Sequence, residues 1–264
     1  MSEYVKFAHE LADASGKVIR KYFRSKMTVE DKPDDSPVTV ADQQTESVMR
    51  QMISEKYPEH AILGEEHGYQ EATGSRWKWV LDPIDGTRSF VAGMPIFGTL
   101  IALLDREVPQ LGVIDMPILR ERWFGFRKRE CYFYSSQDDR KPTSCMVSKQ
   151  KKVEQSILYS ADPDMFNNFQ KPRFDQVSAQ AKLVRFGGDC YNYGLLASGF
   201  IDLVIEADLK SYDVMALVPV VESAGGIISD WQGSSDFGDE WDGCVVAAAS
   251  LELHSQTLSL LQTD

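Results

Sequence analysis

The sequence predicts a mixed α/β fold, and three patterns along its 264 residues lead to that prediction. An amphipathic helical pattern opens the chain, and short β-like runs separated by turn residues fill its middle. Helical and β-like segments then alternate towards the end of the chain. A chain of this length can form one large domain or two closely packed ones with a sizeable core. We expect a single domain over residues 1–264, made of two packed halves that divide near residue 142.

In the first half, apolar residues recur at helical spacing over residues 2–24, which predicts a long amphipathic helix. Its apolar stripe is expected to face the core or an interface. Residues 31–37 are polar, contain two prolines and are typical of a mobile loop. A second helix is predicted over residues 43–57, and short apolar runs at 61–63 and 79–81 are predicted to be strands.

Four β-like runs between turn signals, within residues 95–134, predict an antiparallel meander. The runs cover residues 97–104, 111–115, 123–126 and 131–134. The long apolar run at 97–104 suits the core and a subunit interface equally. Residues 135–142 are polar and are expected to form an exposed loop.

The second half shows strand and helix patterns in alternation. Strands are predicted at residues 157–159, 183–186, 201–206 and 244–248, and helices at 190–198, 213–224 and the C-terminus. Pro219 falls after the first turn of the 213–224 helix and is expected to kink it. Gly225 and Gly226 are expected to end that helix.

Composition argues against several classes of protein. The chain is 43% hydrophobic and 26% charged, which is ordinary for a globular protein, and its net charge of −12 argues against nonspecific binding to nucleic acid or to an anionic membrane surface. No apolar run approaches the roughly 20 residues that span a bilayer. Four cysteines show neither a C-x-x-C pair nor metal-ligand spacing, and no signal peptide is visible, so we expect a cytoplasmic protein with reduced thiols.

Two carboxylates, Asp82 and Asp85, follow the predicted strand at 79–81 in a turn that also contains Gly86 and Thr87. Gly86 permits a tight turn, and Thr87 suits the start of a helix, whose free N–H groups can hold an anion. The turn therefore offers acidic ligands for a hard cation beside donors for a phosphate. Taken alone, however, two aspartates at this spacing are more commonly a solvated turn.

Other carboxylates lie at the boundaries of predicted elements, where binding and catalytic groups concentrate. Glu65 and Glu66 follow the predicted strand at 61–63, and Asp213 begins the predicted helix at 213–224. Taken alone, Glu65 and Glu66 fit solvated loop acids. Asp42 lies near the start of the second helix, where an acid is stabilised by the helix dipole whether or not it has a further role.

Together these motifs resemble the inositol monophosphatase superfamily, whose members are magnesium-dependent, lithium-sensitive phosphatases. The resemblance rests on Asp-Pro-Ile-Asp-Gly-Thr at 82–87, Gly-Glu-Glu at 64–66, Tyr-Asp at 212–213 and Glu-Ser-Ala-Gly-Gly at 222–226, and it covers essentially the whole chain. It implies one phosphatase domain with a layered α-β-α-β-α sandwich, the fold shared with fructose-1,6-bisphosphatase. The active site would then lie between the two halves, and a homodimer is expected.

The resemblance also implies a set of metal ligands. Glu65, Asp82 and the carbonyl of Ile84 would bind one Mg²⁺, and Asp82, Asp85 and Asp213 a second, with two or three ions in all, Mn²⁺ as a substitute and Li⁺ as an inhibitor. Oxygen ligands of this kind suit Mg²⁺. Without a cation, a phosphate beside these acids would be repelled by roughly 4 kcal/mol per unit-charge pair at 4 Å. We therefore expect activity to depend strictly on metal.

The resemblance further assigns the catalytic residues, namely Glu65, Asp42 and Thr87. Thr87, oriented by Asp42, would take a proton from the attacking water, and the N–H groups of Gly86 and Thr87 would hold the phosphate.

Within the superfamily, residues 88–95, 187–191 and 217–222 look most like the histidinol-phosphatase branch. This implies hydrolysis of histidinol phosphate, a reaction of histidine biosynthesis. That substrate carries an ammonium and an imidazole, and the acids Asp189 and Glu206 lie where the family binds the leaving alcohol. The expected substrate-binding residues are Asp85, Gly86, Thr87, Arg88, Arg185, Gly188, Asp189, Glu206 and Asp213.

Three alternatives stay open. Asp189 could simply cap its helix and pair with Arg185 on the surface. The enzyme could instead be an inositol-1-phosphatase or a broader sugar-phosphate phosphatase. In a third alternative, the fold serves as a non-catalytic regulator that binds metal or phosphate. In each case the expected partner is a small phosphate ester or ligand, with no nucleic acid and no membrane.

Overall fold

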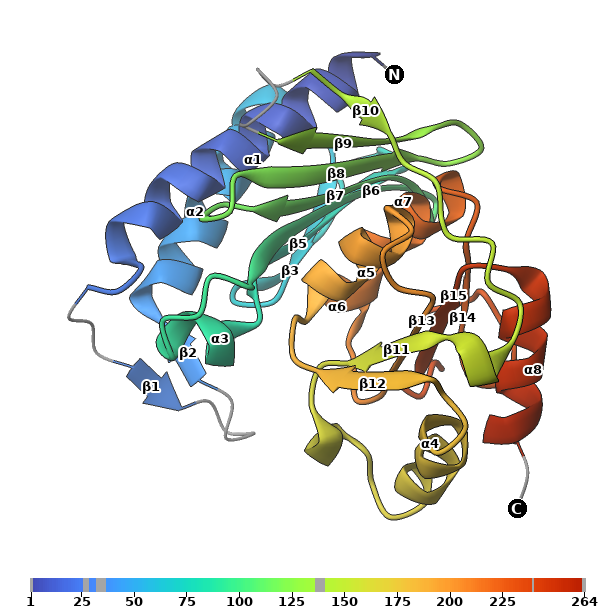
Figure 1. The fold of residues 1–264 in the computed structure, drawn as a ribbon. Coiled ribbons are helices and arrows are strands. Elements are labelled where there is room, and N and C mark those ends of the chain that lie inside the picture. Colours follow the sequence, from blue (N-terminus) through green and yellow to red (C-terminus); the bar gives the residue numbers. More distant parts are fainter. Residues whose placement is uncertain (1, 26–28, 32–36, 136–140, 239, 263–264) are drawn as a thin grey trace.

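The computed structural model describes residues 2–25, 29–31, 37–135, 141–238 and 240–262. Two large β-sheets lie on either side of a layer of helices, and further helices cover their outer faces (Figure 1); the short strands β1 (Val29–Asp31) and β2 (Pro37–Thr39) form a third, two-stranded sheet. The predicted mixed α/β class and the layered sandwich are confirmed. Most of the two loops predicted at 31–37 and 135–142 lies outside the described residues. No helix in the described part of the chain is long and apolar enough to cross a membrane.

The first sheet has eight strands in the order β10-β9-β8-β7-β6-β5-β3-β4. In chain order they are β3 (Ala61–Gly64), β4 (Gly68–Gln70), β5 (Trp77–Asp85), β6 (Gly98–Asp105), β7 (Val108–Met116), β8 (Glu121–Phe126), β9 (Cys131–Ser135) and β10 (Thr143–Ser144). Successive strands from β5 to β9 pair antiparallel with one another, which confirms the predicted meander. Strands β3 and β5 are parallel, so their C-terminal ends reach the same edge of the sheet.

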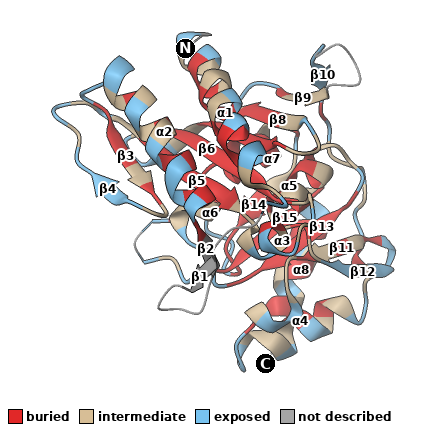
Figure 2. Ribbon diagram, turned by 90° about the vertical axis from the view of Figure 1, so that its left-hand side faces the viewer, coloured by how far each residue is buried: buried red, intermediate tan, exposed pale blue. Residues whose placement is uncertain are grey.

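Helices α1 (Ser2–Tyr22) and α2 (Val40–Lys56) cover the outer face of this sheet (Figure 1). Their buried stripes pack on apolar side chains of the strands, and their far sides are exposed (Figure 2). The other face of the sheet is covered as well, so the whole run from Phe97 to Leu104 is buried. The sequence left open whether this run serves the core or a subunit interface. Its burial within the chain shows that it belongs to the core.

The second sheet has five strands in the order β12-β11-β13-β15-β14. They are β11 (Ile157–Ser160), β12 (Leu183–Phe186), β13 (Leu203–Glu206), β14 (Ile227–Ser229) and β15 (Val245–Ala248). Strand β11 is parallel to β12 and β13, whereas β15 is antiparallel to both of its neighbours. Helices α4 (Gln170–Ser178) and α8 (Leu251–Leu261) pack on the outer face of this sheet.

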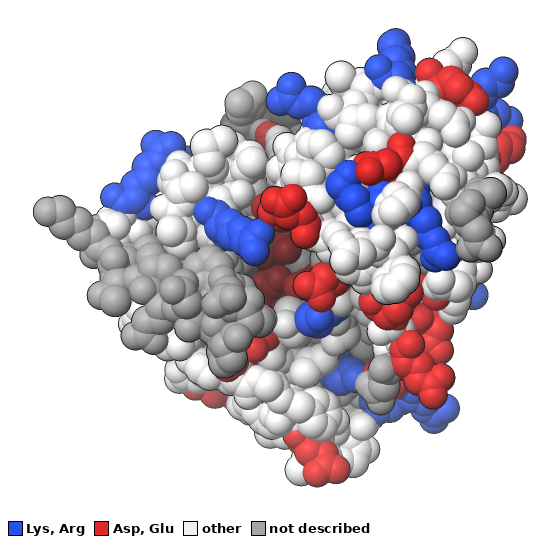
Figure 3. All heavy atoms as spheres, turned by 90° about the horizontal axis from the view of Figure 1, so that it is seen from below, with Lys and Arg blue, Asp and Glu red and all other residues white. Residues whose placement is uncertain are grey.

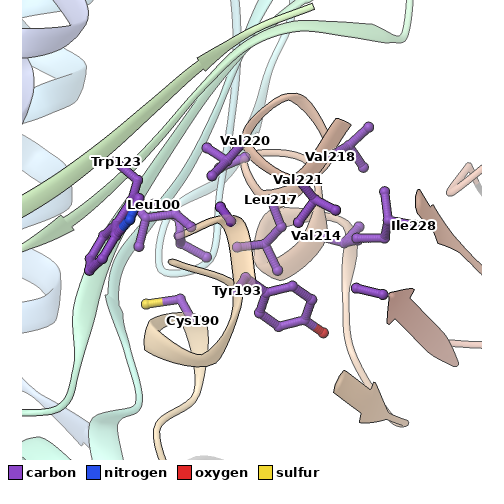
Figure 4. Close-up of a cluster of buried hydrophobic side chains, with 14 of the residues drawn as sticks. Leu100, Trp123, Cys190, Tyr193, Val214, Leu217, Val218, Val220, Val221 and Ile228 are labelled. Carbon is purple, nitrogen blue, oxygen red and sulfur yellow. The ribbon is translucent and has the colours of Figure 1, made fainter. Parts of the chain in front are cut away.

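Helices α5 (Cys190–Ala197) and α7 (Leu217–Ser223) fill the layer between the two sheets (Figure 1). In Figure 4, Leu100 and Trp123 of the first sheet lie on one side of this layer, and Tyr193 and Leu217 belong to its helices. The same buried cluster continues into the second sheet through Val204, Val245 and Ala247. One core therefore joins the two sheets.

The close approach of α7 to the first sheet depends on two glycines. Gly112 of β7 and Gly125 of β8 lie directly opposite one another in the sheet. A Cβ at Gly112 would lie 2.0 Å from the carbonyl oxygen of Ala216, and one at Gly125 would lie 2.3 Å from that of Pro219. Because both strand positions are glycine, no side chain separates the strands from α7, and the backbone of α7 rests directly on β7 and β8.

The prediction of one kinked helix over 213–224 is wrong, because the chain forms two helices there. They are α6 (Ser211–Val214) and α7 (Leu217–Ser223), and they are separated at residues 215–216. Pro219 lies in the first turn of α7, where its missing N–H removes no hydrogen bond. The break comes before the proline, and it leaves α6 free to present Asp213 independently of α7.

Candidate active site

A pocket of about 390 Å³ opens between the two halves of the chain. The first sheet contributes the segments that follow β3 and β5, and the second half contributes the ends of β11 and β13 and the starts of α5 and α6. Figure 3 shows acidic side chains in and around a hollow on the lower face of the molecule. The predicted location between the two halves agrees with this geometry.

Strand β5 is longer than the predicted strand at 79–81, and an irregularity near its end shapes the site. Its regular pairing with β6 breaks between Asp82 and Asp85, where Pro83 has no N–H to donate. The carbonyl of Pro83 instead accepts a hydrogen bond from Thr99 Oγ1 at 2.9 Å. This change in the direction of the strand brings the side chains of Asp82 and Asp85 together, whereas a regular strand would keep them apart.

Asp82, Asp85 and Asp213 form an acidic group, of which Asp85 and Asp213 line the pocket and Asp82 is buried beside them. Each offers a carboxylate oxygen, and these oxygens lie within 4.8 Å of one another. Asp213 is held by the first turn of α6, where its Oδ2 accepts the N–H of Lys210 at 2.7 Å. Asp82 is buried, and its Oδ1 has no hydrogen-bond partner among the described residues. A buried oxygen without a partner fits a bound cation.

Glu65 lines the same pocket but does not belong to this close group of three. Its backbone N–H donates to the carbonyl oxygen of Leu81 at 3.3 Å, which places it beside Asp82 along neighbouring strands. Its charge also raises the pKa of Asp82, Asp85 and Asp213. The four predicted metal ligands with carboxylate groups therefore lie in one electrostatic neighbourhood.

Burial and mutual repulsion together disfavour the charged forms of these acids. Burial, followed by the charge of Asp213, raises the pKa of Asp85 to about 7. Burial and the charge of Glu65 raise the pKa of Asp213 to about 7, although the N–H of Lys210 opposes the shift. The pKa of Asp82 lies well above its usual range, first through burial and then through Glu65 and Asp85. A divalent cation would relieve this repulsion, and an all-oxygen donor set suits Mg²⁺.

Thr87 and Asp42 lie beside this acidic group. Thr87 Oγ1 is 3.0 Å from the carbonyl oxygen of Ile84, to which it donates, and 3.4 Å from Asp42 Oδ1. The other oxygen of Asp42 accepts the N–H and the hydroxyl of Thr39 at 2.9 and 2.5 Å and so caps α2. Asp42 is therefore both a helix-terminal acid and a neighbour of Thr87. Burial raises its pKa to about 6 against the opposing bonds from Thr39.

Asp189 lies over the turn at Gly86. Gly86 has a φ of 90°, and a Cβ there would lie 2.6 Å from Asp189 Oδ2. Ser89 donates its hydroxyl to the same oxygen at 3.3 Å. Burial and then the charge of Asp85 raise the pKa of Asp189 to about 7, while Ser89 and Arg88 lower it. This acid reaches across the pocket from the second half.

Glu206 ends β13 at the other side of the pocket and is buried. Its Oε2 accepts the hydroxyl of Tyr193 at 2.8 Å, and its Oε1 has no partner among the described residues. Burial raises the pKa of Glu206 to about 8, although the bond from Tyr193 opposes the shift. A donor or cation on a ligand would complete its hydrogen bonding.

The comparisons with known proteins agree with this geometry. The family model described as the inositol monophosphatase family matches residues 1–263. The chain belongs to the inositol monophosphatase family. Members of this family are named as phosphatases, and the chain is accordingly a phosphatase.

Three similar proteins place it within the family. The bifunctional phosphatase IMPL2, chloroplastic, from Arabidopsis thaliana is 45% identical, covering 99% of this chain and 76% of that protein. A histidinol-phosphatase from Chlorobaculum parvum is 35% identical over 88% of each chain. A solved structure of an inositol monophosphatase from Zymomonas mobilis matches with a TM-score of 0.87 and 38% identity, covering 99% of this chain and 98% of that one.

The structure corrects three expectations, which concern Arg185, Asp189 and Gly188. Arg185 in β12 is exposed and does not line the pocket, nor do the described ion pairs join it to Asp189. Asp189 occupies the N-cap position of α5 but makes no capping hydrogen bond with its side chain. The alternative in which Asp189 caps its helix and pairs with Arg185 is therefore wrong. Gly188 has a φ of 109° and shapes the turn before α5, without lining the pocket.

Arg88 does reach the pocket, where it meets a residue that sequence reasoning missed. Its exposed guanidinium donates to Asp162 Oδ2 at 2.8 Å, and both residues line the pocket. The sequence contains no signal for Asp162, which follows β11, or for Tyr193. The N–H of Cys190, 2.5 Å from Asp85 Oδ2, could have been anticipated, since the first N–H groups of a helix need partners.

Proposed function

We propose that the chain is a Mg²⁺-dependent histidinol-phosphatase, which hydrolyses histidinol phosphate to histidinol and phosphate. The observation that carries the substrate choice is a further pair of acids, Asp189 and Glu206, which line the same pocket as Asp85 and Asp213 of the acidic group. An ammonium or a protonated imidazole on the leaving alcohol would satisfy these acids, whereas a neutral polyol offers only hydroxyls. The relative from Chlorobaculum parvum supports the choice by its name.

The proposed metal ligands are Glu65, Asp82, the carbonyl of Ile84, Asp85 and Asp213. Members of the family are generally metal-dependent, and the unpartnered buried oxygen of Asp82 fits a cation. When bound, Mg²⁺ supplies Lewis-acid chemistry that activates water and stabilises the charge on the phosphate and the leaving oxygen. Two or three ions are proposed, with Mn²⁺ as a substitute and Li⁺ as an inhibitor.

The chain itself supplies the proton path and the phosphate contacts in this proposal. Thr87 would accept a proton from the attacking water, because its hydroxyl lies 3.4 Å from Asp42 Oδ1, which can accept the hydroxyl proton in turn. The N–H groups of Gly86 and Thr87 would hold the phosphate at the turn beneath Asp189. Arg88 would approach the phosphate from the exposed rim.

A substrate panel tests the proposal. Phosphate release is measured for histidinol phosphate and inositol 1-phosphate, with Mg²⁺ and with a chelator. We expect release to require the metal and kcat/KM to favour histidinol phosphate by about tenfold or more, as expected for a site built to pair with a charged group. A clear preference for inositol 1-phosphate would support the second candidate, an inositol or sugar-phosphate phosphatase, for which the Zymomonas mobilis structure argues by its name. No release from either ester would leave the non-catalytic alternative.

We also propose that the whole chain acts as one domain of two halves, in the cytoplasm and as a homodimer. All four cysteines are buried free thiols, which suits a reducing compartment. Exposed apolar side chains that a second copy could cover include Phe169, Phe186 and Phe200. Light scattering on the purified protein tests the dimer, and a monomer at micromolar concentration would contradict it.

A further inference from the structure

Glu46 is a fully buried acid that the proposed mechanism does not use. It lies in the middle of α2, and none of its side chain is exposed. Burial of a carboxylate is costly unless it is paired and hydrogen-bonded. Arg50, one helical turn further on, supplies the pairing, with its Nε 2.7 Å from Glu46 Oε1. The pair is therefore neutral as a unit and adds no net charge near the acidic group of the pocket.

The remaining bonds of Glu46 go to the turn that carries Glu65. The N–H of Glu66 donates to Glu46 Oε2 at 2.7 Å, and the N–H of His67 donates to Oε1 at 3.1 Å. Arg50 also donates to the carbonyl oxygen of Gly68, at the far end of the same turn. The buried pair thus binds the backbone directly after Glu65.

Glu46 also determines which residue can precede Glu65. A Cβ at Gly64 would lie 2.1 Å from Glu46 Oε1 and 2.4 Å from Cδ, so a side chain at this position would push the carboxylate out of its present place. Gly64 does not have a positive φ, so the backbone conformation does not by itself require glycine. The carboxylate of Glu46 therefore lies against the backbone on both sides of Glu65.

The contacts between Glu46 and the backbone beside Glu65 have a consequence for metal binding. Glu65 lies close enough to Asp82, Asp85 and Asp213 to raise the pKa of each, so like charges repel its carboxylate until a cation arrives. A three-residue turn between short strands could otherwise relax away from the group. If the turn is already held in place when the ion binds, the free energy of binding does not have to include the cost of bringing the turn back.

We propose that Glu46 is a positioning residue for metal binding, which acts through Glu65 by fixing the backbone on both sides of it. This inference rests on the proposed function, because it takes Glu65 as a ligand of Mg²⁺. Glu46 itself touches neither metal nor substrate.

The test is a double-mutant cycle between Glu46→Gln and Glu65→Gln, read out as Mg²⁺ affinity. Calorimetric titration of the metal-free protein with Mg²⁺ measures affinity without substrate, and Mg²⁺-dependent phosphate release gives kcat and KM beside it. We expect Glu46→Gln to weaken Mg²⁺ binding about ten- to a hundredfold, the range for residues that orient metal ligands, with most of kcat recovered at saturating Mg²⁺. In the Glu65→Gln background, Glu46→Gln should weaken binding no further.

Glu55→Gln, on the exposed side of the same helix, is the matched control and should bind Mg²⁺ like the wild type. If Glu46→Gln does not fold, Glu46→Asp retains the charge opposite Arg50 and replaces it in the cycle. Wild-type affinity in the Glu46 variant, or an equal loss in both backgrounds, would overturn the positioning role while leaving the phosphatase proposal intact. Failure of the wild type itself to bind Mg²⁺ would overturn the proposed function instead.

Discussion

Two sets of acids lie in and beside the pocket and differ in their surroundings. The first, here called the metal-side acids, is Asp82, Asp85 and Asp213, whose oxygens lie within 4.8 Å of one another. The second, here called the alcohol-side acids, is Asp189 and Glu206, each of which accepts a hydroxyl, from Ser89 and Tyr193 respectively. Burial is the main cause of the raised pKa in both sets; neighbouring carboxylates are the next cause for Asp82, whereas the hydroxyl of Tyr193 opposes the shift of Glu206.

This difference suggests how one acidic protein can use similar side chains for two purposes. Converging carboxylates at this spacing favour a multiply charged ion, and a small hard cation suits oxygens so close together. Acids that each have a hydroxyl partner need one further donor, which an organic cation can provide. Four changes to the protein or its solution, in order of expected effect, test whether the two sets differ in this way.

The largest effect is expected for Asp82→Asn. Removing this ligand should lower kcat/KM in saturating Mg²⁺ by about a hundredfold or more, since even residues that only orient ligands are worth ten- to a hundredfold. The melting temperature of the metal-free protein should not fall, because the variant removes a buried charge that lacks a partner on one oxygen. Asp164→Asn, at the exposed rim of the pocket, is the control. Near-wild-type activity of Asp82→Asn would remove Asp82 from the metal site.

Gly125→Ala tests the packing that brings the two sets together. Its Cβ would meet the carbonyl oxygen of Pro219 at 2.3 Å, so α7 must move away from the first sheet. We expect a loss of about 1–3 kcal/mol in the free energy of unfolding, measured by urea denaturation. Mg²⁺ affinity should fall with it, because Asp213 lies just before α7. Gly238→Ala, where the nearest atom is a side-chain oxygen at 3.1 Å, should change neither quantity by a comparable amount.

Asp189→Asn separates the alcohol-side acids from the metal-side acids. It should lower kcat/KM for histidinol phosphate by about ten- to a hundredfold more than for inositol 1-phosphate, as expected for a lost hydrogen bond to a charged group. The Mg²⁺ concentration for half-maximal activity should stay the same. If both esters lose activity equally, Asp189 does not recognise the leaving alcohol.

The smallest effect is a change of stability with pH. Asp85 and Asp213 have a pKa of about 7 in the folded chain against an ordinary value of 3.8, so between these values the folded state binds more protons than the unfolded state. The metal-free protein should therefore lose stability as pH rises from about 4 to about 7. Saturating Mg²⁺ should remove the part of this pH dependence that is due to the metal-side acids, and it should leave the part that is due to Asp189 and Glu206. Thermal melts from pH 5 to 8, with and without Mg²⁺, measure both parts, and a slope that Mg²⁺ does not change would contradict the distinction.

Much of the fold could be predicted because its signals are local. The periodic apolar stripe predicted a helix over 2–24, and α1 covers Ser2–Tyr22. Alternating short runs predicted the meander of the first sheet, which is confirmed. Two of the errors lie near prolines. Near Pro83 the strand continues past an irregularity, and near Pro219 a new helix begins where a kink was predicted.

The sequence by itself determined the kinds of side chain and their order, including two acids, a glycine and a threonine in one short turn. Only the tertiary structure decided which distant groups join them. It placed Asp162 and Tyr193 at the pocket, kept Arg185 outside it, and set Glu46 behind Glu65. Local spacing constrains a few neighbouring residues, whereas this convergence depends on how closely α7 packs on Gly112 and Gly125 and on the pairing of β3 with β5.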